Sequence, residues 1–193
     1  MNCSKYYRQA LTISTEKFEN KQFEDLPKNF SQEINNIALP WLIDNILCYM
    51  CPRISGDKDD IANFIYLFVA LFNCMKRLLG MYIKSNPLPD NLDADDFESL
   101  VKILTVSAYT LSFKSLGLDD LEPCKRYYKE FRKKIFLERH ERWPATKQIK
   151  YFVEQTGLDA SGINKIEDEM FKLSDYKGCI AEHMEMIKYL EKQ

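Results

Sequence analysis

The sequence predicts an all-α fold: a five-helix bundle around a central helix, with an N-terminal arm, a helical insertion and a short C-terminal helix. Apolar residues recur at three- and four-residue spacing, most clearly in residues 97–114 and 163–176, which gives each segment one apolar helical face. No segment shows the alternation of period two that is typical of a half-buried strand. The 193 residues, 46% of them hydrophobic, suffice for one domain with a sizeable core.

The first 38 residues are polar and weakly periodic, and we expect them to form an N-terminal arm with one short helix. Residues 39–193 are expected to form the domain itself, with a core that begins near Pro40. Pro40 suits the first turn of a helix, and Pro52 would end that helix. Residues 61–83 are apolar nearly all round, so they are predicted to form the central helix.

A turn-rich break separates the central helix from a third helix, which we expect to begin at a cluster of aspartates near Asp93 and to end at Gly117. Ile149, Tyr151, Phe152 and Val153 supply the apolar residues of an expected fourth helix. The next helix starts after Gly157, with Asp159 or Ser161 as its N-cap. A last helix is predicted over about residues 180–190.

Residues 121–144 form a basic insertion between the third and fourth helices, and residues 122–142 hold eight Lys or Arg against four Glu. Aromatic residues are interleaved with the basic ones, which is a pattern found in phosphate- or nucleic-acid-binding surfaces. A solvated amphipathic helix lying on the bundle explains the same pattern, and we favour it because charge runs are usually solvated faces. The candidate partner or anion patch consists of Lys125, Arg126, Lys129, Arg132 and Lys133.

Charge and hydropathy favour a protein partner over nucleic acid or membrane. The formal net charge of −2 gives no overall attraction to nucleic acid or to an anionic membrane, so neither is expected to bind. The most apolar segment, residues 61–83, is interrupted by polar residues, and we expect a buried helix of a soluble protein. No secretory leader pattern is found at the N-terminus.

The six cysteines are scattered mostly through apolar helical contexts, which favours reduced thiols in the cytoplasm, the nucleus or both. Cys48 and Cys51 have the two-residue gap of a zinc or redox site, but no second such pair exists and the chain has only two histidines. We therefore expect structural cysteines, with no metal and no cofactor.

No catalytic site is predicted. The sequence contains none of the common nucleophile, phosphate-loop or zinc-protease motifs, and neighbouring acids on a helix diverge rather than converge on a substrate. The protein is therefore expected to be neither an enzyme nor a binder of a small-molecule substrate.

Two stretches carry a family resemblance: S-A-Y-T-L-S-F-K-S-L-G-L-D-D at residues 107–120 and Y-F-V-E-Q-T-G-L-D-A-S-G-I-N-K-I-E-D-E-M-F-K-L-S-D-Y at residues 151–176. They resemble the third to fifth helices of a cyclin box, and the phrase I-N-K-I-E-D-E-M-F-K-L carries most of the likeness. The resemblance spans roughly residues 39–180, and the single box with a short tail is most similar to the P-type (phosphate-system) cyclins. The insertion at residues 121–144 departs from that pattern, because such cyclins have a short connection there.

The cyclin resemblance implies a regulatory subunit that binds and activates a cyclin-dependent protein kinase, as a heterodimer, in the cell cycle or in nutrient signalling. In that family a Lys and a Glu at the kinase-facing surface hydrogen-bond backbone groups near the kinase C-helix, and an aromatic residue packs beside them. The matching residues here are Lys114, Glu167 and Tyr176, and the neighbours Phe113 and Ser115 belong to the same expected kinase-binding set.

Two alternatives remain open from the residues alone. Lys114 is also what a helix dipole favours in a last turn, and Glu167 could be an exposed acid paired with Lys172 or Lys165. The chain could likewise be a cyclin-fold module that binds another protein or nucleic acid and has no kinase partner, because one fold serves many functions.

Overall fold

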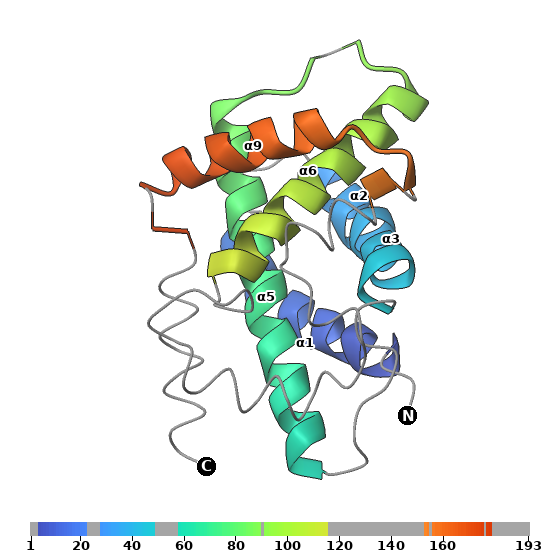
Figure 1. Ribbon diagram of the computed structural model, residues 1–193, viewed down its shortest axis with the longest axis vertical. Coiled ribbons are helices and arrows are strands. Elements are labelled where there is room, and N and C mark those ends of the chain that lie inside the picture. Colours follow the sequence, from blue (N-terminus) through green and yellow to red (C-terminus); the bar gives the residue numbers. More distant parts are fainter. Residues whose placement is uncertain are drawn as a thin grey trace.

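The computed structural model describes residues 4–22, 28–48, 58–89, 91–115, 153–154, 156–175 and 177–178. Within these residues every regular element is a helix and none is a strand, which confirms the all-α class. The elements are α1 (Ser4–Gln22), α2 (Lys28–Glu33), the π-helical η1 (Ile34–Ala38), α3 (Leu39–Leu42), the π-helical η2 (Ile43–Leu47), α5 (Lys58–Ser85), α6 (Ala94–Ser115) and α9 (Ala160–Leu173) (Figure 1).

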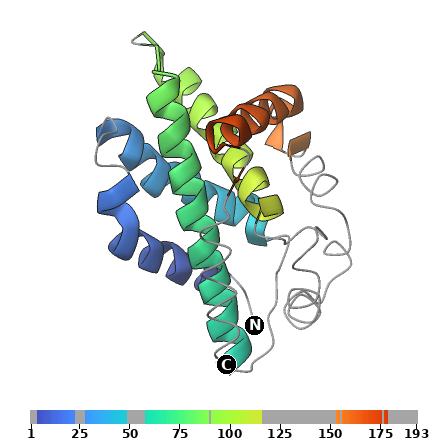
Figure 2. The ribbon, with the colours of Figure 1, turned by 90° about the vertical axis from the view of Figure 1, so that its left-hand side faces the viewer.

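Helix α5 is the central helix of the described fold. It packs against α1, α6 and α9, and Figure 2 shows α1 and α9 on opposite sides of it. Residues Ile61–Ser85 are long and apolar enough to cross a membrane, yet 72% of the most apolar window is buried inside the structure. Burial of this kind is what the core helix of a globular bundle shows, and it agrees with the helix expected over residues 61–83.

Helix α1 contributes directly to the core. Tyr6, Tyr7 and Ala10 are buried, and the ring of Tyr7 lies 5.0 Å from that of Phe64 and 4.6 Å from that of Phe68 on α5. The expectation that the core begins near residue 40 is therefore wrong, and the arm's expected short helix is 19 residues long. Its buried stripe is narrow, so the surrounding polar residues concealed it in the sequence.

Polar contacts also join α1 to α5. The hydroxyl of Ser14 donates to Asn73 Oδ1 at 2.7 Å, and Lys76 Nζ donates to Thr15 Oγ1 at 2.9 Å. Ser14 and Lys76 are fully buried. Two of the polar residues that interrupt the apolar pattern of α5, Asn73 and Lys76, therefore meet polar partners on α1, as is usual for buried polar groups.

Residues 28–48 are helical throughout, so this helix begins well before Pro40 rather than at it. Proline has no N–H to donate and its ring crowds the preceding turn, which strains a regular α-helix. The N–H of Leu39 bonds the carbonyl of Ile34 five residues earlier, in the π pattern, and the N–H of Cys48 does the same with Ile43. The helix accommodates Pro40 between two π-helical segments.

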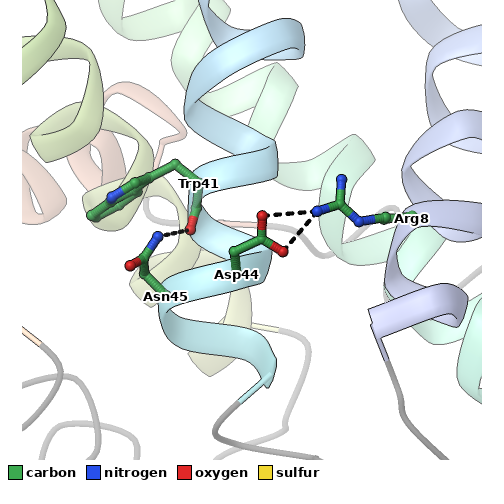
Figure 3. A network of polar contacts seen from close by, with 4 residues as sticks. All are labelled: Arg8, Trp41, Asp44 and Asn45. Carbon is green, nitrogen blue, oxygen red and sulfur yellow. Dashed lines mark hydrogen bonds and ion pairs between the residues drawn. The ribbon is translucent and has the colours of Figure 1, made fainter.

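An ion pair links α1 to this proline-containing helix (Figure 3). Arg8 Nη2 donates to both carboxylate oxygens of Asp44, at 2.7 and 2.8 Å, and Asn45 Nδ2 donates to the carbonyl oxygen of Trp41 one turn earlier. The side chains of Arg8 and Asp44 are 52% and 50% exposed, so solvent screening keeps the contribution of this pair to stability small.

The ends of α6 and α9 lie close to those expected from the sequence. Of the two candidate N-caps of α9, the structure selects Asp159, whose carboxylate accepts from the N–H groups of Ser161 and Gly162, both at 3.0 Å. Asp93 caps α6 in the same manner, because its Oδ1 accepts from the N–H of Asp96 at 2.8 Å. Both caps satisfy backbone donors that a helix start leaves without intrahelical partners.

Cys74 on α5 is disulfide-bonded, whereas Cys48 is not in a disulfide. The expectation that the cysteines are reduced is therefore wrong for Cys74. Its helical context and burial gave no sign of the bond, because a disulfide depends on which segments the fold brings together.

The insertion at residues 121–144 and the last helix at residues 180–190 lie outside the described residues, as do residues 149–152 of the expected fourth helix. Val153, at the end of that segment, is buried in the core. The division into an arm and a domain at residue 39 stays a prediction.

Candidate functional site

The fold brings Lys114 and Glu167 into contact. Lys114 lies in the last turn of α6 and Glu167 in the middle of α9, and Lys114 Nζ is 2.5 Å from Glu167 Oε1. Lys172, considered above as a partner for Glu167, bonds Asp168 one turn earlier on the exposed side of α9. The contact of Glu167 with a lysine therefore joins two helices rather than two turns of one.

The pair is partly removed from water. The side chain of Lys114 is 25% exposed and that of Glu167 is 12% exposed. Attraction between opposite charges is stronger at such a border than in bulk water, but removing water from each charge opposes it. The pair therefore combines a fixed geometry with an accessible edge.

The contact leaves hydrogen-bonding capacity unused within the described part of the chain. An ammonium has three N–H donors and a carboxylate has two acceptor oxygens, whereas this contact joins one Lys114 nitrogen to one Glu167 oxygen. A surface that offers both donors and an acceptor side by side matches a polypeptide backbone, which carries C=O and N–H groups in alternation.

The amphipathic pattern of α9 places Glu167 on the face that packs against α6. Ile163, Glu167 and Met170 share that buried face at one-turn spacing. The hydroxyl of Ser107 on α6 lies 3.1 Å from the carbonyl oxygen of Ile163, so a second polar contact fixes the first turn of α9 against α6.

The neighbours of Lys114 in the sequence lie in different surroundings. Phe113 is only 4% exposed, and its ring lies 5.6 Å from that of Tyr109, so its side chain belongs to the core. Ser115 is partly exposed at the end of α6, beside the pair. Tyr176 and the basic residues Lys125, Arg126, Lys129, Arg132 and Lys133 lie outside the described residues.

Sequence reasoning missed two contacts that tie α5 to α9 and to the turn after it. The hydroxyl of Tyr82 on α5 hydrogen-bonds Glu169 on α9; burial chiefly, and then the charge and hydrogen bond of Glu169, raise the pKa of Tyr82. The guanidinium of Arg77 on α5 donates to the carbonyl oxygen of Gly178, just beyond α9. No local pattern announces either contact, because each joins residues far apart in the chain.

Among the described residues, no group of three or more His, Cys, Asp or Glu is arranged to hold a metal ion. Comparisons with protein-family models, with curated proteins and with solved structures find no match to this chain.

Proposed function

We propose that the chain is a regulatory subunit that binds a cyclin-dependent protein kinase and activates it by positioning the kinase C-helix. In this proposal catalysis belongs wholly to the kinase. The observation that carries it is the interhelical contact between Lys114 and Glu167, which forms at the two positions that the cyclin resemblance assigns to kinase binding.

The proposed mechanism is a population shift. A protein kinase orients the phosphates of ATP only when its β3 lysine and its C-helix glutamate are paired. A partner that binds only the inward C-helix raises the population of that state. To convert a kinase from about 1% to about 99% active, the partner must prefer the active state by about 10⁴-fold.

A preformed charge pair suits this task. Lys114 and Glu167 hold each other in place before the partner arrives, so less side-chain freedom is lost on binding than for two independent surface charges. Lys114 would donate to backbone carbonyls of the C-helix region, and Glu167 would accept from backbone N–H groups there.

Affinity capture tests the class of partner. The tagged full-length chain is used as bait in a lysate of its source cells, and the bound fraction is analysed by mass spectrometry and by absorbance at 260 and 280 nm. Recovery of a protein kinase whose activity rises with added chain supports the proposal. Recovery of nucleic acid or of other proteins, without a kinase, supports a cyclin-fold binding module instead.

Variants of the pair test the site. In the complex the kinase would cover the pair. Removing one member of a charge pair that is buried in an interface leaves the other desolvated and unpaired, which costs about 2–5 kcal/mol of binding free energy. Lys114→Ala and Glu167→Ala are therefore each expected to weaken kinase binding by roughly tens to thousands of fold. The double variant should lose much less than the sum of the two, because the residues act as a unit.

Lys172→Ala is the matched control, because Lys172 forms an ion pair of the same length with Asp168 but on the exposed side of α9. It should bind the kinase as the wild type does. Full activation by both Lys114→Ala and Glu167→Ala would contradict the site while leaving the fold unaffected.

A kinase partner implies that the chain resides in the cytoplasm, the nucleus or both. The disulfide at Cys74 weighs against a reducing compartment, where disulfides are rare. Fractionation of source cells, with thiols trapped at lysis, measures both the compartment of the chain and the redox state of Cys74. A reduced Cys74 in the cytosolic or nuclear fraction agrees with a kinase partner, and a chain found only outside these fractions with Cys74 oxidised contradicts it.

A further inference from the structure

The turn that follows α9 lies directly against the end of α6. Gly178 is buried and has φ +53°, and a Cβ built on it would lie 2.3 Å from Ser115 Oγ and 3.1 Å from Ser115 Cβ. Real Cβ atoms do not approach other atoms as closely as 2.3 Å, so a Cβ here would force Ser115 and the turn apart, and the positive φ would add backbone strain. Ser115 follows Lys114 in the sequence, so this close approach occurs one residue from the charge pair.

Arg77 holds the same turn from the opposite helix. Its guanidinium reaches from α5 and donates to the carbonyl oxygen of Gly178. Within the turn, Ser174 Oγ accepts from the N–H of Gly178 at 2.9 Å and donates to the carbonyl oxygen of Phe171 at 2.7 Å. Gly178 is thus fixed to α5, to α9 and against α6 at once.

These contacts bear on the geometry of the pair. Glu167 and Ser174 are seven residues apart, which is about two turns, so they lie on the same face of α9. A shift of the turn relative to the last turn of α6 would change the distance between Lys114 Nζ and Glu167 Oε1. An ion pair with partial exposure is too weak to hold the end of α6 against α9 by itself, and such sites need support from a surrounding shell.

We propose that Arg77 and Gly178 are positioning residues, which fix the end of α6 against α9 and thereby set the geometry of the Lys114–Glu167 pair. Their importance for kinase binding rests on the proposed function, but their effect on the pair does not.

The test is a double-mutant cycle on the pair, measured by equilibrium unfolding of the full-length chain. The four proteins are the wild type, Lys114→Ala, Glu167→Ala and the double variant. In the wild-type background the coupling is expected to change the folding equilibrium constant by roughly two- to fivefold. In the Gly178→Ala background the coupling should disappear, which is a factor of about one, because the turn is displaced from Ser115.

Gly157→Ala is the matched control. Gly157 also has positive φ, at +71°, but a Cβ there would meet nothing within 4 Å. Both substitutions therefore introduce left-handed strain at an alanine, and only the one at Gly178 adds the collision with Ser115. The coupling should survive in the Gly157→Ala background.

Two further variants keep the proposal testable if Gly178→Ala does not fold. Ser115→Gly, combined with Gly178→Ala, removes both atoms that the new Cβ would strike and should restore the coupling. Arg77→Met removes the donor to Gly178 and should lower the coupling, whereas Arg77→Lys, which keeps a donor, should retain part of it.

The outcomes separate this inference from the proposed function. Three results would overturn the positioning role. The coupling could persist in both Gly178→Ala and Arg77→Met, it could be lost equally in Gly157→Ala, or it could be absent in the wild type. If coupling is lost in Gly178→Ala but not in Gly157→Ala, and binding of Gly178→Ala to the captured kinase falls at least tenfold, both proposals are supported. If coupling is lost but kinase binding is unchanged, the positioning role holds and the assignment of the pair to the kinase fails.

Discussion

Two tyrosines, Tyr109 in the core and the partly buried Tyr82, couple the stability of the protein to alkaline pH. Tyr109 lies on the buried face of α6, and complete burial raises the pKa of its hydroxyl well above the ordinary value of about 10. Tyr82 is shifted in the same direction, by burial and by Glu169. In both residues the folded state favours the neutral phenol, because burial disfavours the phenolate.

We predict that the free energy of unfolding falls as the pH rises above about 10, the ordinary pKa of tyrosine. The sign follows from the raised pKa: below that value both states are protonated, and above it the unfolded state loses the proton while the folded state retains it. Urea unfolding at pH 9 and pH 11 measures the effect. Tyr109→Phe should lose less stability over this interval than the wild type, and an equal loss in both proteins would contradict the assignment to Tyr109.

Helix α9 depends on its N-terminal cap. Asp159 satisfies two backbone donors in the first turn, and its negative charge lies at the positive end of the helix. The cap matters for the candidate site because α9 carries Glu167 two turns further on.

We predict that Asp159→Ala lowers the free energy of unfolding by about 0.5–2 kcal/mol. Ser161→Ala is the control, because Ser161 takes part in the cap through its backbone N–H and its side chain is exposed. Thermal unfolding followed by circular dichroism compares the two variants. Equal melting temperatures for both would show that the cap contributes nothing.

Helix α1 is an integral part of the bundle, since its tyrosines fill space between it and α5. We predict that Tyr7→Ala destabilises the protein by about 3–5 kcal/mol, as the loss of a large buried ring does elsewhere. Gln9→Ala, at an exposed position of the same helix, should change stability little. Chemical denaturation measures the free energy of unfolding of both variants. Equal values would indicate that α1 is a detachable arm and not a core helix.

At the scale of the whole molecule, α6 and α9 pack directly on each other and on α5, although the basic insertion separates them in the sequence. We predict that replacing residues 122–143 by a short linker leaves the helical bundle and its cooperative unfolding intact. Circular dichroism and a single denaturation transition measure this. Loss of cooperativity would show that the aromatic residues of the insertion belong to the core, and unchanged partner binding would show that its basic residues are passive.

The sequence predicted those parts of the fold that rest on local periodicity. The apolar pattern gave the central helix, and the aspartates and glycines gave the ends of α6 and α9 to within a few residues. It failed where long-range packing decided the outcome. The buried stripe of α1 is narrow, and Pro40 looked like a helix start because proline is favoured there, whereas the structure accommodates it inside a helix with π-helical segments.

For the candidate site, the sequence by itself determined that Lys114 ends an apolar stripe on one helix and that Glu167 borders the apolar face of another. Only the tertiary structure decided that these residues meet, that Phe113 is buried in the core, and that Arg77 bonds Gly178 in the turn that lies against Ser115. The physical reason is that helical periodicity fixes which face a residue occupies, whereas the contact between two faces depends on how helices distant in the sequence pack together.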